Sequence, residues 1–177
     1  MVARKGDDAT MNQTTMDRTS DRELVITRTF NAPPRIVFDA WTKAELVRRW
    51  WAPKSRRVTI VSCDADVRVG GKYRYVLKHA AHGEFAFSGQ YREVTPHSRL
   101  IYTEIFEPAG RGADEEGGAI ITVTFEERDG KTYLVSHSLF PSKDVLDTVL
   151  ATGMEGGMRE TMDQLDELVA SLLKGAS

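Results

Sequence analysis

The chain has 177 residues, a net charge of −2 and a single cysteine. This length suits one domain with a short extension, and the even mixture of acidic and basic residues provides no basic surface for a nucleic acid or an anionic membrane. One cysteine excludes an internal disulfide, and no apolar run approaches the roughly 18 residues of a membrane span. Residues 1–22 also lack the apolar core of a secretory signal. We therefore expect a cytoplasmic protein with neither a nucleic acid nor a membrane as its partner.

Residues 1–22 differ in composition from the rest of the chain. They combine several threonines with charges of both signs and contain little that could be buried. Such a composition is typical of a disordered segment, because it buries too little apolar surface to offset the entropy of ordering. We expect a disordered polar leader over residues 1–22, in which Met11 and Met16 are alternative start sites to Met1, followed by a single domain over residues 23–175.

The domain begins with a predicted strand and two short helices. Residues 23–30 alternate apolar and polar side chains, which is the period of a half-buried strand. The first helix starts at Pro33 or Pro34, because proline fits the first turn of a helix. The second helix begins after Thr42 and ends before Pro53, since proline cannot continue a helix.

Six further strands are predicted before residue 140. Each is a run of alternating, β-branched or aromatic residues bounded by glycine, proline or a polar turn. Asp129-Gly130 is the strongest hairpin signal in the chain, and Gly89 indicates a bend within a long strand. An acidic, glycine-containing loop is predicted over residues 108–118. The strands are predicted at residues 57–63, 72–78, 84–94, 99–107, 119–128 and 131–140.

The chain closes with one long predicted helix, residues 142–173. Apolar side chains recur there every three or four residues, the pattern of a helix with one buried face. The centre of that face mixes small residues with flexible methionines, a combination that suits the wall of a hollow better than a close-packed core. These residues are Gly153, Gly157 and Thr161, together with Met154, Met158 and Met162.

The order of elements predicts an α+β fold with a cavity. Consecutive strands joined by hairpins form an antiparallel sheet, here of about seven strands, which twists and curls. A single helix laid across the concave face cannot fill it from end to end, so we expect a hollow between the two. Its expected walls are the inward aromatic side chains, two polar groups and the helix centre: Phe38, Trp41, Trp50, Tyr73, Tyr75, Phe85, Phe87, Tyr102, Glu104, His137, Met154, Met158 and Met162.

Six blocks of sequence between residues 23 and 173 follow one another in an order that is found in a known family. The blocks are Arg28-x-Phe30-x-Ala32-Pro33 with Val37-Phe38-x-Ala40-Trp41-Thr42, Trp50-Trp51-x-Pro53, Asp66-x-Arg68-x-Gly70-Gly71-x-Tyr73-Arg74, Gly89-x-Tyr91-x-Glu93-Val94, Thr122-Val123-Thr124-Phe125 and Gly153-Met154-x-x-Gly156-Gly157. Together they resemble the SRPBCC (START-like) superfamily, and within it the branch of homologues of the heat-shock-protein ATPase activator.

The resemblance implies a helix-grip fold, in which a curved antiparallel sheet wraps around a long C-terminal helix. Members of the superfamily carry lipids, sterols, polyketides and plant hormones, and a minority are cyclases or hydrolases. The eukaryotic namesake of this branch binds a chaperone. Relatives commonly place a tryptophan after the helix glycine, where this chain has Met158, and the smaller, flexible side chain would enlarge the hollow.

Three functions fit these observations. The favoured one is binding of a small hydrophobic molecule, with no cofactor or metal, because an apolar wall with few polar groups is the usual make-up of a ligand pocket. The first alternative is a co-chaperone-like interaction module. The second, less favoured, is a cyclase- or hydrolase-type enzyme that uses His137, Glu104 or Tyr102 in the same cavity. Whether the protein forms a homodimer is left open.

Overall fold

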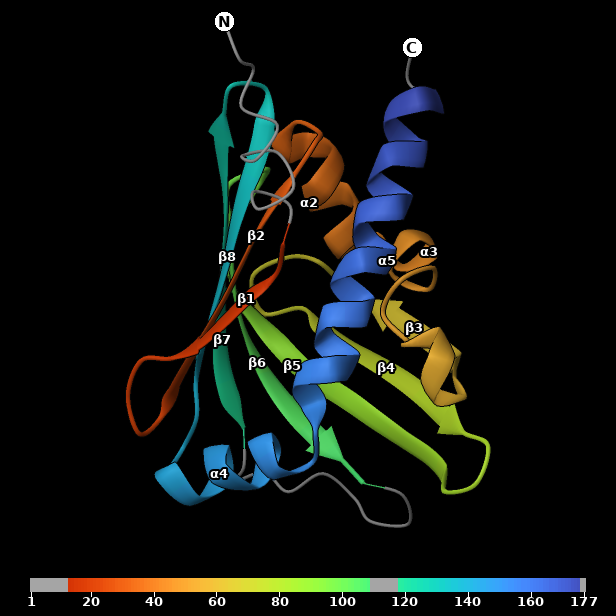
Figure 1. The fold of residues 1–177 in the computed structure, drawn as a ribbon, viewed down its shortest axis with the longest axis vertical. Coiled ribbons are helices and arrows are strands. Elements are labelled where there is room, and N and C mark those ends of the chain that lie inside the picture. The colour runs from red at the N-terminus through yellow and green to blue at the C-terminus, as the bar shows by residue number, and fades with distance from the viewer. Residues whose placement is uncertain (1–12, 109–117, 176–177) are drawn as a thin grey trace, which may run out of the picture.

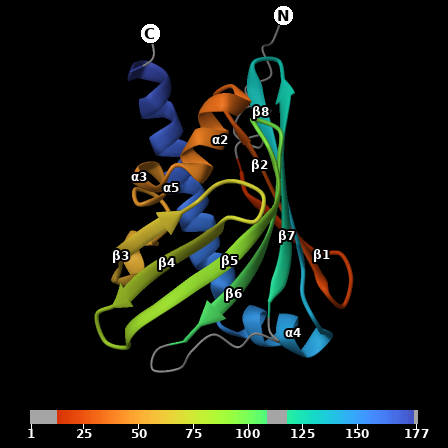
Figure 2. The same ribbon diagram turned by 180° about the vertical axis from the view of Figure 1, so that it is seen from behind.

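The computed structural model describes residues 13–108 and 118–175. The first part of the predicted leader and nearly all of the predicted acidic loop lie outside the described residues. Eight antiparallel strands form one curved sheet in the order β1-β2-β8-β7-β6-β5-β4-β3. The last helix, α5 (Met154–Gly175), runs along the concave face of that sheet, as Figures 1 and 2 show from opposite sides. The predicted helix-grip architecture is thereby confirmed.

All seven strands predicted within the domain are present. Their alternation of buried and exposed residues explains why the sequence pattern located them, since one face of an antiparallel sheet packs on the core. The strands are β2 (Glu23–Phe30), β3 (Val58–Ala65), β4 (Lys72–His79), β5 (Gly83–Thr95), β6 (Arg99–Glu107), β7 (Ala119–Arg128) and β8 (Lys131–Leu139).

An eighth strand, β1 (Thr15–Arg18), lies where the sequence predicted a disordered leader. It pairs antiparallel with β2, and Met16 lies opposite Ile26. The prediction of disorder is therefore wrong for these four residues. Composition could not indicate the strand, because β1 owes its order to the hydrogen-bonding edge of β2 rather than to buried side chains of its own.

Two short helices connect β2 to β3 as predicted, but the second ends earlier than Pro53, and a 3₁₀ turn that was not predicted follows it. They are α2 (Pro34–Thr42), α3 (Ala44–Val47) and η1 (Lys54–Arg56). Pro34 lies in the first turn of α2, where the missing N–H has no helical partner to lose. Helix α2 is buried along most of its length and wedges between α5 and the part of the sheet that contains β7 and β8.

The single C-terminal helix predicted over residues 142–173 is in fact two helices. Helix α4 (Lys143–Ala151) ends before Gly153, whose φ of +75° lies in the left-handed region that glycine adopts without steric cost. Helix α5 begins directly afterwards in a different direction. In Figure 1, α4 lies across the lower end of the molecule while α5 rises along the sheet. The apolar stripe read from the sequence therefore belongs to two separate surfaces.

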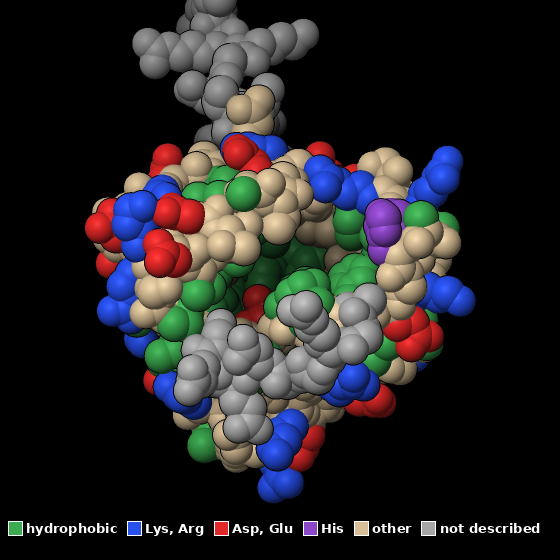
Figure 3. Space-filling model, turned by 90° about the horizontal axis from the view of Figure 1, so that it is seen from below, with side chains coloured by type: hydrophobic (Ala, Val, Ile, Leu, Met, Phe, Trp, Pro, Cys, Tyr) green, Lys and Arg blue, Asp and Glu red, His purple; other side chains and the backbone are tan. Residues whose placement is uncertain are grey.

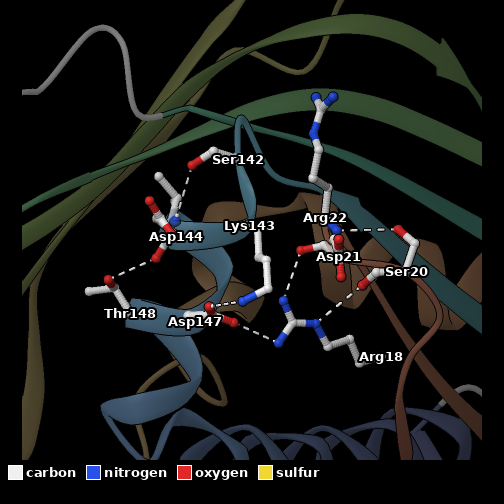
Figure 4. A network of polar contacts seen from close by, with 10 residues as sticks. Arg18, Ser20, Asp21, Arg22, Ser142, Lys143, Asp144, Asp147 and Thr148 are labelled. Carbon is white, nitrogen blue, oxygen red and sulfur yellow. Dashed lines mark hydrogen bonds and ion pairs between the residues drawn. The ribbon is translucent and has the colours of Figure 1, made fainter.

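Polar contacts fix α4 to the turn between β1 and β2, as Figure 4 shows. The guanidinium of Arg18 donates to Asp147 Oδ1 at 2.7 Å and to the carbonyl oxygens of Ser20 and Asp21. Lys143 also donates to Asp147, at 2.7 Å, one helical turn away. These contacts link β1, the strand that was not predicted, to α4 at the lower end of the molecule.

The interior is closely packed where α2 lies between the sheet and α5. Phe30, Val37, Leu134 and Leu165 are completely shielded from solvent there, and Trp50 is 1 % exposed. The indole nitrogen of Trp50 donates to the carbonyl oxygen of Ala40 at 2.8 Å, so its polar atom is also satisfied. This half of the helix–sheet interface is solid.

Candidate functional site

The opposite half of the interface is hollow. Seen from below, Figure 3 shows an opening lined mainly by hydrophobic side chains. The sheet and α5 contribute half-buried apolar residues at this end, among them Phe85, Phe87, Met154 and Met158, and Phe106 is 50 % exposed. A concave surface of this composition is the usual form of a small-molecule site.

A small cavity continues from this end into the core. Its volume is about 10 Å³ when measured as the space open to the centre of a water molecule, which is room for about one water. Six aromatic side chains and a single carboxyl group form its wall: Trp41, Trp51, Tyr73, Tyr75, Tyr91, Tyr102 and Glu104. We refer to this set as the aromatic cage.

Strand register brings the four tyrosines of the cage together. Tyr73 and Tyr75 lie two residues apart on β4, so both side chains point to the same face of the sheet. Tyr91 of β5 lies directly opposite Tyr102 of β6. Gly89 is the partner of Tyr73 across the β4–β5 ladder. A Cβ atom at Gly89 would come within 2.7 Å of the Tyr73 ring and 1.7 Å of a backbone oxygen, so only glycine fits at this position.

Ring contacts connect the cage to the surface. The ring of Trp51 lies 5.3 Å from Tyr75 and 6.2 Å from Phe87, measured between centroids. Phe87 in turn lies 5.3 Å from the half-exposed Phe106. Aromatic rings at such separations attract one another through edge-to-face and offset arrangements. A continuous apolar path therefore leads from the surface to the cage.

Glu104 is the polar group of the cage. Its Oε1 atom is buried and has no hydrogen-bond partner among the described residues. Burial raises the pKa of this carboxyl from 4.5 to about 7, because the charged form loses its hydration. Burial also raises the pKa of Tyr91 to about 12 and that of Tyr102 well above its ordinary value, so the tyrosines stay protonated at neutral pH.

The structure divides the predicted site residues into four groups. Trp41, Tyr73, Tyr75, Tyr102 and Glu104 come together in the cage. Phe85, Phe87, Met154 and Met158 are half-buried around the wider opening. Phe38, Trp50 and Met162 are buried in the packed core and line neither space. The remaining residue, His137, lies elsewhere.

His137 faces away from the hollow. It alternates along β8 with the buried Ser136 and Ser138, so its side chain points to the convex face of the sheet. Its Nε2 atom lies 2.6 Å from Glu23 Oε2, and the side chain is 35 % exposed. The prediction that His137 lines the cavity opposite Glu104 is therefore wrong.

The glycines of the C-terminal stripe do not enlarge the hollow as predicted. Gly153 forms the break between α4 and α5, and a Cβ atom at Gly156 would come within 2.5 Å of the Arg56 guanidinium, whereas one at Gly157 would meet Arg56 only at ordinary contact distance. Arg56 of η1 lies over this turn of α5 and donates to the carbonyl oxygen of Gly153 at 3.3 Å. Beside it, Ser55 donates through both its backbone N–H and its hydroxyl to Glu160 of α5.

Two residues of the cage were missed from the sequence. Tyr91 continues the alternation of Phe85 and Phe87 along β5, so the period of two could have identified it. Trp51 follows α3 in an irregular turn, where no periodicity assigns a direction to the side chain. Of the pair Trp50-Trp51, the structure places the second in the cage wall and the first in the core.

Other reactive groups do not gather at the site. Burial raises the pKa of the Cys63 thiol to about 11, which keeps it protonated. Within residues 13–108 and 118–175, no three histidine, cysteine, aspartate or glutamate side chains are arranged to hold a metal ion. Over the same residues, no helix is both long and apolar enough to cross a bilayer.

A curved sheet that grips a helix above an aromatic hollow defines a protein of the START-like, helix-grip class. The chain belongs to the family described as activator of Hsp90 ATPase homolog 1-like protein, whose sequence profile matches residues 31–170. This assignment confirms the branch that the sequence motifs resemble. No curated protein matches the chain.

Solved structures of bacterial proteins share the fold. A Rhodobacter sphaeroides protein superposes with a TM-score of 0.80 at 23 % identity, over 90 % of this chain and 99 % of the other. A Nitrosomonas europaea protein gives a TM-score of 0.75 at 25 % identity, over 89 % and 99 %. A Staphylococcus epidermidis protein gives 0.73 at 31 % identity, over 89 % and 94 %. The likeness extends over almost the whole length of each relative.

Proposed function

We propose that this protein binds a small hydrophobic molecule in the hollow between the sheet and α5. The observation that carries the proposal is the contrast in burial along one interface: the partly buried Phe85, Phe87 and Met158 and the half-exposed Phe106 lie at the open end of a protein whose remaining core is closely packed. Large side chains left half-exposed around a concavity favour a ligand that completes their burial, at roughly 25 cal/mol per Å².

The dimensions indicate how such a molecule would lie. The aromatic cage has room for about one water molecule, which is enough for a single polar head group but not for an apolar body. The apolar body would therefore occupy the wider opening, against the phenylalanines and the flexible Met154 and Met158.

The enzyme alternative has less support. Glu104 and Tyr102 do meet in the cage, but His137, the expected proton-transfer group, points to the opposite face of the sheet. No histidine, serine or cysteine lines the cage within the described part of the chain. General acid–base catalysis needs a second group within hydrogen-bond reach of the same point. Binding is therefore the simpler use of the site.

A blocking substitution tests the proposal. The fluorescent apolar dye 8-anilinonaphthalene-1-sulfonate should bind the wild-type protein, and Met158→Trp should raise the Kd about tenfold, because the larger side chain fills the opening. Leu173→Trp is the matched control, since Leu173 is 41 % exposed near the far end of α5. Equal dye binding by the wild type and Met158→Trp, or no binding by either, would contradict the proposal.

A further inference from the structure

The cage has the composition of a cation site. Its wall contains six electron-rich aromatic rings, one carboxyl group and no lysine or arginine. The face of a tryptophan or tyrosine ring attracts a cation through its quadrupole, and the attraction grows when water is excluded. A carboxylate adds the formal counter-charge. An anion in the same place would meet the carboxylate with no positive group to offset the repulsion.

Glu104 lacks a partner that a cation would provide. Its buried Oε1 makes no hydrogen bond within the described residues, although leaving a buried acceptor unsatisfied is costly. The hydroxyl of Tyr73 donates to the backbone oxygen of Thr103 at 2.9 Å and also lowers the pKa of Glu104 through a side-chain hydrogen bond, so Oε1 is the oxygen of this carboxyl group that stays open. The cage therefore presents acceptors, and a ligand head group with N–H donors would complement it.

We infer that the hydrophobic ligand is an amine, whose primary ammonium head occupies the aromatic cage beside Glu104 while its apolar body lies against Phe87, Phe106 and Met158. This inference rests on the proposed function and adds the chemical class of the ligand. An ammonium group is about the size of a water molecule, which matches the space in the cage. Ring contacts of Trp51 with Tyr75 and with Phe87 link the cage to the apolar residues of the opening.

Three probes with the same aromatic body test the inference. They are 2-phenylethylamine, 2-phenylethanol and phenylacetate, which carry a cationic, a neutral and an anionic head. In calorimetric or NMR titrations of the full chain at pH 7.5, the amine should bind about tenfold more tightly than the alcohol, and phenylacetate should bind most weakly. This comparison uses the wild-type protein, so it does not depend on how any variant folds.

A matched pair of variants assigns the preference to Glu104. Glu104→Gln should weaken binding of the amine about tenfold and change binding of the alcohol less than threefold. Glu107→Gln, on the opposite face of the same strand and paired there with Arg74, should leave all three probes unchanged. An amine that binds no better than the alcohol, or that is unaffected by Glu104→Gln, would overturn the inference.

The dye experiment distinguishes a failure of the amine assignment from a failure of the proposed function. If the dye and the alcohol bind at the Met158 opening without any preference for the amine, hydrophobic binding stands and the amine assignment is wrong. If neither the dye nor any of the three probes binds, both are wrong.

Discussion

The two halves of the α5–sheet interface are built differently. Around the C-terminal half of α5, Leu165, Leu168 and Val169 are at most 4 % exposed, and the helix packs against α2 and β2. Around the N-terminal half, Met154 and Met158 are only half-buried, and Figure 3 shows an opening at the lower end of the molecule. The same helix and the same sheet thus produce a solid core at one end and a hollow at the other.

The two halves differ in packing because a third layer, helix α2, is present in only one of them. A curved sheet and a straight helix diverge, and the volume between them is filled only where another element enters it. Helix α2 enters the upper half, where its residues Ile36, Val37 and Trp41 are buried. Nothing among the described elements enters the lower half in the same way, because α4 crosses the end of the molecule instead (Figure 1). The length and position of α2 therefore decide where the hollow begins.

Truncating one side chain in each half should give the largest difference in the free energy of unfolding. Leu165→Ala should lower the free energy of unfolding by about 3 kcal/mol, since it leaves a cavity in a rigid surround. Met158→Ala should cost less than about 1 kcal/mol, because the side chain is already half-exposed. Urea denaturation of both variants measures the two values. Equal losses would show that the lower half is as tightly packed as the upper.

The carboxyl group of the cage should make stability depend on pH. Burial raises the pKa of Glu104 from 4.5 to about 7, so the folded state holds a proton that the unfolded state releases between these values. The folded protein should therefore lose about 2–3 kcal/mol as the pH rises from about 4.5 to 8, in comparison with Glu104→Gln, which cannot ionise.

Urea denaturation of both proteins at several pH values gives this difference directly. Other titrating groups are common to the two proteins and cancel in the comparison. Parallel stability profiles, or a wild type that gains stability relative to Glu104→Gln as the pH rises, would show that Glu104 is solvated rather than caged.

Substitutions at the break between α4 and α5 should have the smallest effect on the free energy of unfolding. Gly153→Ala should reduce stability by about 1 kcal/mol, because a φ of +75° strains any side chain with a Cβ. Gly153→Asn should cost less, since asparagine tolerates the left-handed region better than alanine. Urea denaturation would rank the two variants. If alanine were tolerated as well as asparagine, α4 and α5 would not need the observed break.

Periodicity in the sequence located the strands and most of the cage. Tyr73, Tyr75 and Tyr102 alternate with polar residues, so their direction followed from the period of two. His137 was misplaced because β8 inverts the usual rule: Ser136 and Ser138 are buried, while Val135 shares the outer face with His137. Where polar residues face the core, alternation identifies the two faces but not which of them is inside.

Other errors arose because the deciding contacts are distant in the sequence. The stripe of residues 142–173 continues in phase through Gly153, so no local pattern marked the break. The close approach of Arg56 to Gly156 joins residues about a hundred positions apart in the chain. The cytoplasmic location, the homodimer and the chaperone alternative remain predictions.

The attachment of η1 to α5 is polar, unlike the apolar packing around the C-terminal half of the same helix. The lower part of α5 is fastened on one side by Arg56, Ser55 and the backbone N–H of Lys54, which donates to Gln164 at 3.0 Å. Contacts of this kind can be exchanged for water at small net cost, whereas apolar packing cannot. The N-terminal half of α5 is therefore held to η1 less firmly than the C-terminal half is held by its apolar packing.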